Sequence, residues 1–305
     1  MTISVVLTTY NGEQYILEQL NSLLHQTRQP DEVLIRDDGS TDNTVRICQK
    51  FIDQNSLGTT WSVSVNERNL GWAENFLNGF DLAKGELIFP CDQDDIWLDD
   101  KISLMADVME KDDGIGLLTC GYIRQIEDEN SCKRENKTFS KTITKLPFDS
   151  KMLFVDYPGC VYCFTKWFYE QIKEYRFEGY PHDALLFRMG RLTEKAYYYD
   201  FPGIVWRRHL HNATGKPVRE NKKMQSDIVY YVNCLELMKK WCDEHPGNED
   251  KAELIMNNIS FYQTRLMAFE HKKIIGRNSL FSCLKYLAFY PRPKSILGDV
   301  IRIIH

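Results

Sequence analysis

The feature that most constrains the fold is a regular alternation of strand and helix patterns over the first hundred residues. Short runs rich in β-branched and apolar residues predict strands at 3–9, 31–38, 61–66 and 86–91. Between them, apolar residues recur at helical spacing and predict helices at 11–26, 42–52 and 71–83. Strands that alternate with helices form a parallel sheet covered on both faces, so we predict an α/β fold.

The rest of the chain follows the pattern less regularly. The periodicity predicts strands at 114–126 and 158–165, helices at 101–113, 166–175 and 180–192, and a strand–turn–strand unit at 195–216. Residues 127–150 are polar and rich in Lys, which predicts a mobile loop. From about residue 220 the pattern changes to long helical segments, which we interpret as a separate C-terminal region.

Three polar clusters follow predicted strands at the point where each strand ends. The clusters are residues 8–12 ("TTYNG"), 37–40 ("DDGS") and 92–95 ("DQDD"). Ligands of parallel α/β sheets bind at the carboxyl ends of the strands, so we expect these clusters to meet at one edge.

The third cluster contains three carboxylates within four residues. Repulsion between carboxylates this close together is unfavourable unless a cation or water screens it. Asp92 and Asp94 form an Asp-x-Asp pair, whose oxygens suit a hard divalent cation such as Mg²⁺ or Mn²⁺. The alternative is a solvated acidic loop that caps the helix after Asp99.

Composition excludes some classes of protein. The 305 residues carry a net charge of −5 and include nine Cys without a paired framework, which indicates a reducing, cytoplasmic location and no nucleic-acid partner. The sequence has no run of the ~20 apolar residues that a membrane-spanning helix needs. Cys160 and Cys163 form a C-x-x-C pair, which we interpret as two small residues on a buried strand rather than a metal or redox site.

Five segments together resemble a known family: "VVLTTYNGEQYILEQLNSLLHQT", "DEVLIRDDGSTDNT", "RNLGWAENF", "AKGELIFPCDQDDIWLDDKI" and "PHDALLF". In this order they resemble the family-2 inverting glycosyltransferases of the GT-A fold, over about residues 2–216. "DQDDIW" is most similar to the branch of bacterial rhamnosyltransferases and related surface-glycan enzymes. The resemblance implies a GT-A catalytic domain at 1–218 and leaves 219–305 as a helical C-terminal region with a basic amphipathic tail.

The resemblance also implies roles for single residues. Asp183 matches the catalytic base, and Asp94 and His209 match positions that hold the metal. The positions that match binding of the nucleotide sugar are Thr8, Tyr10, Asn11, Glu13, Asp38, Asn75, Asp92 and Gln93.

Physical chemistry agrees with several of these roles but leaves alternatives open. Asp38 can accept a hydrogen bond from a pyrimidine N3–H, or it can be a turn acid that caps a helix. Tyr10 can stack on a base or pack in the core. Asp183 precedes a predicted helix whose dipole favours its ionised form, as a base requires, and is otherwise a plain N-terminal acid. His209 and His211 compete for the metal.

The resemblance implies a metal-dependent transfer of a hexose or deoxyhexose from a UDP- or dTDP-sugar to a hydroxyl of a surface glycan, lipid-linked or protein-linked. Two rival functions are a non-catalytic nucleotide-sugar-binding subunit and a sugar-1-phosphate nucleotidyltransferase. The latter would need a Gly-rich phosphate loop with Lys or Arg after the first strand, where this chain has "TTYNGEQ".

The last 35 residues interleave basic residues with aliphatic and aromatic ones. This pattern suits the surface of an anionic membrane, which would place the enzyme at the inner face of the cell membrane. The same residues also suit packing within the chain or a homo-oligomer contact.

Overall fold

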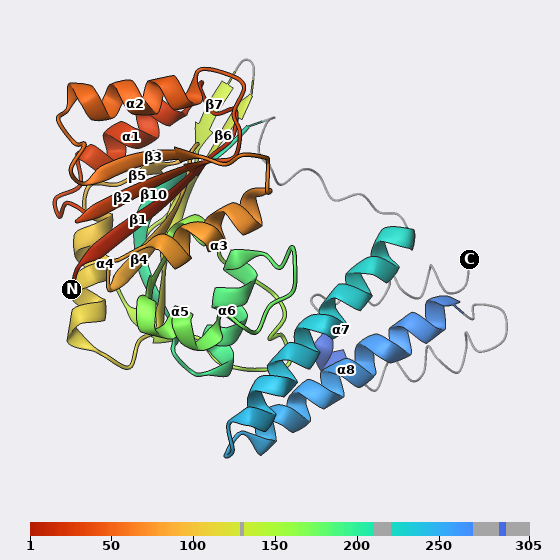
Figure 1. Ribbon diagram of the computed structural model, residues 1–305. Helices are drawn as coiled ribbons and strands as arrows, with labels where there is room; N and C mark the ends of the chain where they lie inside the picture. The colour runs from red at the N-terminus through yellow and green to blue at the C-terminus, as the bar shows by residue number, and fades with distance from the viewer. Residues whose placement is uncertain (129–130, 210–220, 271–286, 291–305) are drawn as a thin grey trace. The chain divides into compact units, whose positions relative to one another are not determined.

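The computed structural model describes residues 1–128, 131–209, 221–270 and 287–290 (Figure 1). The chain divides into two compact units, one made of Met1–Leu146 and Asp156–Ala213, the other of Pro147–Val155 and Thr214–His305.

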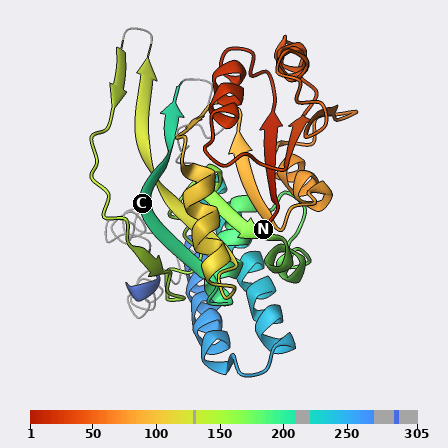
Figure 2. The same cartoon turned by 90° about the vertical axis from the view of Figure 1, so that its left-hand side faces the viewer.

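The first unit is built on a mixed sheet of ten strands within its described residues, in the order β3-β2-β1-β4-β9-β6-β10-β5, with β7 on β6 and β8 on β10. The strands are β1 (Ile3–Thr9), β2 (Glu32–Asp37), β3 (Trp61–Val65), β4 (Leu87–Asp92), β5 (Ile96–Trp97), β6 (Leu117–Asp128), β7 (Ser131–Arg134), β8 (Ile143–Lys145), β9 (Tyr162–Thr165) and β10 (Ala196–Arg208). Strands β1 to β4 pair in parallel, as predicted from the alternating pattern. Figure 2 shows β6 and β10 side by side, also in parallel register.

The helices of this unit are α1 (Ile16–Leu24), α2 (Thr44–Gln54), α3 (Trp72–Leu82), α4 (Lys101–Lys111), α5 (Lys166–Ile172) and α6 (His182–Leu192). The crossovers through α1 and α2 run from β1 toward β3, whereas the crossover through α3 returns to the other side of β1. Because such crossovers are right-handed, α3 lies on the opposite face from α1 and α2. The strand order therefore reverses between β1 and β4, which is where ligands of such sheets bind.

Two predicted segments are corrected by the structure. Residues 127–150 contain β7 and β8 rather than only a loop. Both are edge strands with polar, exposed side chains, and such strands resemble loops in composition. The segment 195–216 begins with one long strand, β10, whose register shifts around Pro202 accommodate the expected turn as a bulge.

Two further bounds differ from the prediction. Helix α1 begins at Ile16 and not at residue 11, because Asn11 has a left-handed φ of 46° and Gly12 continues the turn. The predicted strand at 158–165 starts with a 3-10 turn, η1 (Gly159–Val161), before β9. Cys160 therefore lies in a turn, whereas Cys163 lies on a buried strand.

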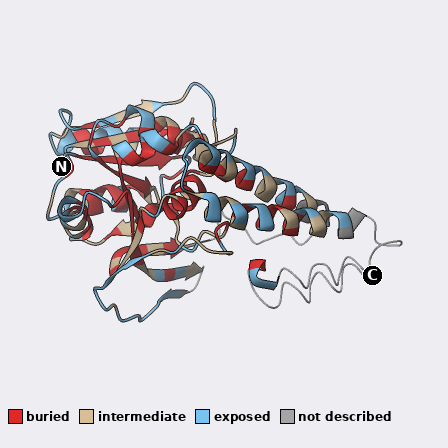
Figure 3. Ribbon diagram, turned by 90° about the horizontal axis from the view of Figure 1, so that it is seen from below, coloured by how far each residue is buried: buried red, intermediate tan, exposed pale blue. Residues whose placement is uncertain are grey.

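The core of this unit lies between the sheet and its helices. Strand β1 is buried along its whole length, which fits a central parallel strand covered on both faces (Figure 3). The loss of water from this apolar surface is the main source of stability.

The second unit consists of α7 (Asn221–Glu244), α8 (Glu249–Glu270) and a 3-10 turn, η2 (Leu287–Phe289). Tyr231 on α7 packs against Tyr262 on α8 with ring centroids 5.3 Å apart, and Phe261 meets Tyr290 at 4.8 Å. Asn258 donates a hydrogen bond to the carbonyl oxygen of Ser150, which joins the short segment 147–155 to α8. No described helix is long and apolar enough to cross a membrane.

Candidate active site

The carboxyl ends of β1, β2 and β4 bring the three polar clusters to one edge of the sheet. Thr8 on β1 lies in register with Asp92 on β4, and Thr9 lies opposite Asp37 on β2. The side chain of Thr9 also donates a hydrogen bond of 2.7 Å to Asp37. The clusters therefore meet at the point where the strand order reverses.

Asp38 is held by the loop that follows β3. Its carboxylate accepts hydrogen bonds of 2.8 Å from the side chain of Asn66 and from the backbone N–H groups of Leu70 and Gly71. The side chain is 3% exposed. The acid that closes this turn is instead Asp37, whose carboxylate accepts hydrogen bonds from the backbone N–H groups of Gly39 and Ser40. The helix-capping alternative for Asp38 is thus wrong.

Asn75 belongs to the same network. It lies on α3, accepts a hydrogen bond from Asn66 and donates one to the carbonyl oxygen of Arg36. Its side chain is buried, so in this structure Asn75 anchors α3 and the Asp38 loop to β2.

Tyr10 and Gln93 form a second pair at the edge of the sheet. The Gln93 amide accepts from the Tyr10 N–H at 2.9 Å and donates to the Tyr10 carbonyl oxygen at 3.0 Å. The backbone of Tyr10 is fixed in this way, while its side chain is 49% exposed. Core packing of Tyr10 is therefore excluded, and Gln93 positions the β1 turn.

Asn11 and Glu13 connect the β1 turn to the start of α2. The side-chain oxygen of Asn11 accepts from the N–H of Thr41 at 2.8 Å. Glu13 accepts from both the backbone and the side chain of Asn43, the residue before α2. These two predicted ligands of the nucleotide sugar thus shape the turn in this structure.

Asp94 meets His209 across the sheet edge. The Nε2 atom of His209 lies 3.0 Å from Oδ2 of Asp94, and the Asp94 side chain is only 16% exposed. The ring of Tyr15 stacks on the ring of His209 with centroids 4.2 Å apart and so fixes its plane. The second candidate, His211, lies outside the described residues. A solvated acidic loop is excluded by this burial.

Arg207 is a site residue that the sequence reasoning missed. Its backbone N–H donates to Asp95, its Nε donates to the carbonyl oxygen of Asp94 at 2.6 Å, and its guanidinium pairs with Glu18. The guanidinium of Arg207 supplies part of the positive charge that the carboxylates of residues 92–95 require. The signal was its place in "RRH", two residues before His209.

Asp92, Asp95 and Cys160 form an adjoining cluster whose ligand atoms all lie within 4.8 Å of one another. Burial raises the pKa of the Asp92 carboxyl to about 7, and repulsion from Asp94 and Asp183 adds to it. Burial and the same kind of repulsion raise the pKa of Asp95 well above its usual range. Burial also raises the pKa of the Cys160 thiol.

A buried cation lies behind this cluster. Lys101, 0% exposed, donates a hydrogen bond of 2.7 Å to the carbonyl oxygen of Cys160. Its Nζ atom lies 3.3 Å from the centroid of the Trp97 ring. Burial lowers the pKa of Lys101, while the neighbouring Cys thiols and Asp95 oppose that shift. The sequence reasoning missed this residue because a Lys at a helix start is usually exposed.

Asp183 lies at the start of α6, as predicted. Burial raises the pKa of its carboxyl, although the N–H of Ala184 and the charge of Arg188 pull it down. Loss of water on burial outweighs the local hydrogen bond in the direction of this pKa, and the expected effect of the helix dipole stays a prediction. The Cα of Gly159 faces this helix start so closely that a Cβ there would lie 3.1 Å from Asp183 and 2.5 Å from His182.

Two sets of donor atoms in the described residues lie close enough together to be considered for a divalent cation. Asp94 and His209 offer a carboxylate oxygen and an imidazole nitrogen already within contact of each other, a set that fits Mn²⁺. The second set includes Cys160, whose raised pKa keeps it a neutral thiol, whereas a thiol must lose its proton to bind a metal. Asp94 and His209 therefore fit a divalent cation better than the set that includes Cys160.

Comparison with known proteins identifies the family. The model of the family "Glycosyl transferase family 2" matches residues 4–173. The chain is 29% identical over 252 residues to dTDP-rhamnosyl transferase RfbG of Shigella flexneri, which covers 75% of this chain and 84% of RfbG. It is 39% identical over 112 residues to glycosyltransferase GlyG of Streptococcus pneumoniae, covering 36% of each.

Solved structures share the fold. The S. aureus TarS fragment 1–349 in complex with UDP has a TM-score of 0.60 at 18% identity, over 99% of this chain and 85% of that one. Mannosyltransferase PcManGT from Pyrobaculum calidifontis, in complex with GDP-Man and Mn²⁺, has a TM-score of 0.52 at 16% identity, over 99% and 85%. The family match covers more than half of the chain, so this protein belongs to glycosyltransferase family 2 and is a glycosyltransferase with the GT-A fold.

Proposed function

We propose that this chain is a metal-dependent inverting glycosyltransferase that moves a hexose or deoxyhexose from a nucleoside-diphosphate sugar to a hydroxyl of a growing surface glycan. One observation carries the proposal. Asp183 lies close enough to Asp92 to raise its pKa, while Asp94 pairs with His209 at the same sheet edge. A base and a diphosphate-binding group thus flank one reaction centre.

The nucleotide binds at the ends of β1 and β2 in this proposal. The exposed ring of Tyr10 stacks on the base, beside Thr8. A carboxylate has about four acceptor sites, and the loop uses three on Asp38. The remaining site accepts the N3–H of a pyrimidine. Asn11, Glu13 and Gln93 hold the turn that presents these groups, and Asn75 holds the Asp38 loop.

Transfer then takes one displacement. Asp183 removes the proton from the acceptor hydroxyl as its oxygen forms a bond to the anomeric carbon. The bond from that carbon to the diphosphate oxygen breaks with its electron pair, and the nucleoside diphosphate leaves. A single displacement inverts the anomeric configuration, and it needs no second carboxylate as a nucleophile.

Asp94 and His209 are the residues that would hold Mn²⁺ or Mg²⁺, with Asp92 on the ribose side of the donor. Such a cation stabilises negative charge on the leaving diphosphate. Arg207 holds the Asp94 backbone, and Tyr15 holds the His209 ring, so the pair is fixed before any ligand arrives.

The similarity to a dTDP-rhamnosyl transferase supports a dTDP-sugar as the donor, with a UDP-sugar as the alternative. We assign catalysis to residues 1–218 and leave 219–305 as a helical region that contacts either the membrane or a second copy. The acceptor is lipid-linked or protein-linked, and the chain works on the cytoplasmic side.

The test is release of nucleoside diphosphate from a panel of dTDP-, UDP- and GDP-sugars, with Mn²⁺, with Mg²⁺ and after chelation. We expect turnover only with a divalent cation. The variant Asp94→Asn should lose at least 100-fold in kcat, because its neutral amide no longer attracts the cation. Asp99→Asn, an exposed change seven residues after Asp92, is the control. Full turnover after verified removal of metal would refute the metal dependence.

A further inference from the structure

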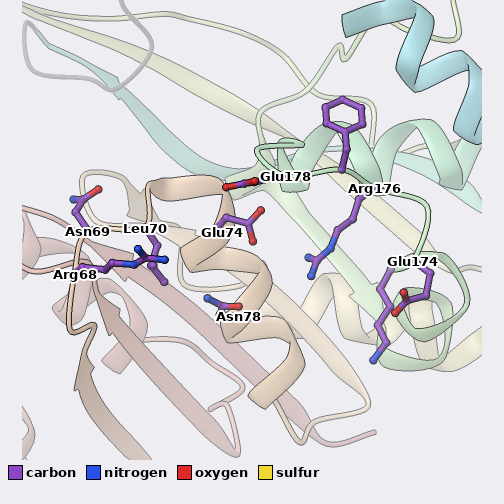
Figure 4. Close-up of a pocket in the computed structure, with 10 residues that line it drawn as sticks. Arg68, Asn69, Leu70, Glu74, Asn78, Glu174, Arg176 and Glu178 are labelled. Carbon is purple, nitrogen blue, oxygen red and sulfur yellow. The ribbon is translucent and has the colours of Figure 1, made fainter.

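Helix α3 has two chemically different faces. Trp72, Phe76 and Phe80 recur at every fourth position and therefore lie on one face. Glu74 and Asn78 lie on the opposite face, where they line a polar cavity of about 680 Å³ (Figure 4). The aromatic face of α3 is therefore directed away from this cavity.

The aromatic face of α3 packs on His182, the residue before Asp183 at the start of α6. The centroid of the His182 ring lies 4.0 Å from that of Phe76 and 5.7 Å from that of Phe80, and the residue is 4% exposed. The ring of Trp72 meets the same His182 ring edge to face, with centroids 5.6 Å apart. Trp72 therefore lies beside the start of the helix that carries the proposed base.

The backbone next to Trp72 is tied to the proposed donor site. The N–H of Gly71 donates a hydrogen bond of 2.8 Å to Asp38, which we assign to the nucleotide base. Asp183 in turn lies close enough to Asp92, at the end of β4, to contribute to the rise of its pKa. Trp72 is thus linked through its chain neighbour to the nucleotide position and through its ring contact to the residue beside the base.

Trp72 remains open to solvent despite these contacts, since it is 46% exposed. A single exposed aromatic side chain is ordinary on a protein surface, so its position is what points to a role. A base must come within about 2.6–3.2 Å of the hydroxyl whose proton it removes, which places the sugar ring of the acceptor at the start of α6. An indole beside that point offers a flat apolar surface for the C–H groups of a pyranose ring.

The contacts favour the acceptor over the donor sugar as the partner of Trp72. The diphosphate of the donor is assigned to Asp94 and His209, and the aromatic ring that stacks on His209 is that of Tyr15. The ring of Trp72 instead contacts His182, on the side of the base. The two aromatic residues therefore serve different halves of the reaction.

We propose that Trp72 is the platform on which the acceptor sugar stacks, and that it selects a neutral pyranose with an open C–H face. The carboxylates of Asp92 and Asp183 at this edge would repel a uronic acid or another acidic sugar, which favours a neutral ring. This inference rests on the proposed function, because it takes Asp183 as the base. It gives the catalytic unit a residue that discriminates among acceptors.

Binding is tested first without any donor. Saturation-transfer NMR on the full-length protein would use the methyl glycosides of rhamnose, galactose and glucose, with methyl glucuronide as the charged probe. We expect the strongest signals from ring C–H protons on one face of a neutral glycoside, lost in Trp72→Ala and kept in Trp72→Phe. Equal signals in wild type and Trp72→Ala, or binding of the glucuronide alone, would overturn the inference.

Two control variants separate stacking on Trp72 from general effects. Trp167→Ala removes another Trp of the catalytic unit, one that is 36% exposed. Trp167 follows β9, whose Thr165 pairs with Leu87 at the start of β4, so it lies at the opposite edge of the sheet from Asp92. Asn78→Ala changes the cavity face of α3. Both should bind the glycosides as wild type does, and loss of binding in either would argue against a specific platform at Trp72.

Kinetics form the second arm. In Trp72→Ala we expect the acceptor KM to rise about tenfold or more while calorimetry gives an unchanged donor Kd, and Trp72→Phe should restore most of the loss. An unchanged acceptor KM, or a raised donor Kd in its place, would overturn the inference while leaving the transferase intact. If the wild type turns over no nucleotide sugar, the proposed function fails and the NMR result decides the role of Trp72 by itself. Melting temperatures confirm folding, and Trp72→Gln replaces Trp72→Ala if that variant fails to fold.

Discussion

At the residue scale, Asp183 combines two properties that a general base needs. It is half-buried, and this burial raises its pKa, while one hydrogen bond from the N–H of Ala184 holds its orientation. A carboxylate with a raised pKa takes a proton more readily, provided that the pH keeps it ionised.

The variant Asp183→Asn should therefore lose transfer while it keeps donor binding. We expect kcat to fall at least 100-fold, since general-base catalysis contributes about 10²–10⁴-fold. Calorimetry of donor binding should give a Kd within about threefold of wild type, because Asp183 is not assigned to the nucleotide. Turnover near the wild-type level would remove Asp183 from the mechanism, and lost donor binding would move it to the donor site.

His182 gives a prediction on stability. Burial lowers its pKa to about 3 from an ordinary value of 6.5, and its ring packs on Phe76 with centroids 4.0 Å apart. His182 therefore binds a proton more readily in the unfolded chain than in the folded one. The stability that its neutral, buried ring contributes is complete above pH 6.5 and is lost as the pH falls toward 3. The free energy of unfolding should drop by about 1.4 kcal/mol per pH unit in this range.

Urea unfolding of wild type and His182→Phe at pH 7 to 4 measures this contribution as the difference between the two slopes. The variant should depend less on pH than wild type. His25→Phe, at an exposed His, should keep the wild-type slope. Equal slopes for wild type and His182→Phe would show that His182 takes up its proton without unfolding.

At the element scale, periodicity was a good guide where a strand is central and a poor one at the edges. The central strands β1 and β4 are apolar because both faces are covered, and the sequence predicted both, together with their parallel neighbours β2 and β3. Strands β7 and β8 border the sheet and carry polar residues, so composition alone resembles a loop. The turn η1 was hidden inside an apolar run, since its shape depends on contacts with α6 and Lys101.

Lys101 links α4 to η1 and gives a prediction at this scale. In Lys101→Met, the carbonyl oxygen of Cys160 loses its donor in a buried place. We expect the free energy of unfolding to fall by about 1–3 kcal/mol, the cost of a buried polar group without a partner. Chemical unfolding of Lys101→Met beside Lys111→Met, an exposed change at the end of the same helix, measures it. Equal losses in the two variants would argue against a role for this contact.

At the scale of the whole molecule, the sequence predicted the parts of the site that lie in local motifs. Asp38, Asp92 and Asp94 lie at or just after the ends of strands, so their meeting at one edge comes from the fold class alone. Arg207, Cys160 and Lys101 reach the site through tertiary contacts between elements far apart in the chain. Periodicity does not encode such contacts, and only Arg207 left a local signal, its place two residues before His209.

The tail prediction also belongs to this scale, although residues 271–286 and 291–305 lie outside the described residues. If the basic and aromatic residues bind an anionic membrane, full-length protein should float with liposomes containing anionic lipid at low salt and dissociate at high salt, because salt screens the attraction. A chain truncated before Lys272 is the control. Full-length protein that stays in the soluble fraction would refute membrane binding, and a changed sedimentation mass on truncation would indicate assembly.

The hydrogen bond between Asp94 and His209 spans 115 residues of sequence, and the bond from Arg207 to Asp94 spans 113. During synthesis, β1, β2 and β4 leave the ribosome long before β10 does. The nascent chain therefore carries an acidic strand end without Arg207 and His209 until about residue 209 has emerged. Under the proposed function, a chain that ends before this point would fold part of the sheet but would lack the pair that we propose holds the metal, and so would leave the cell's supply of activated sugar unused.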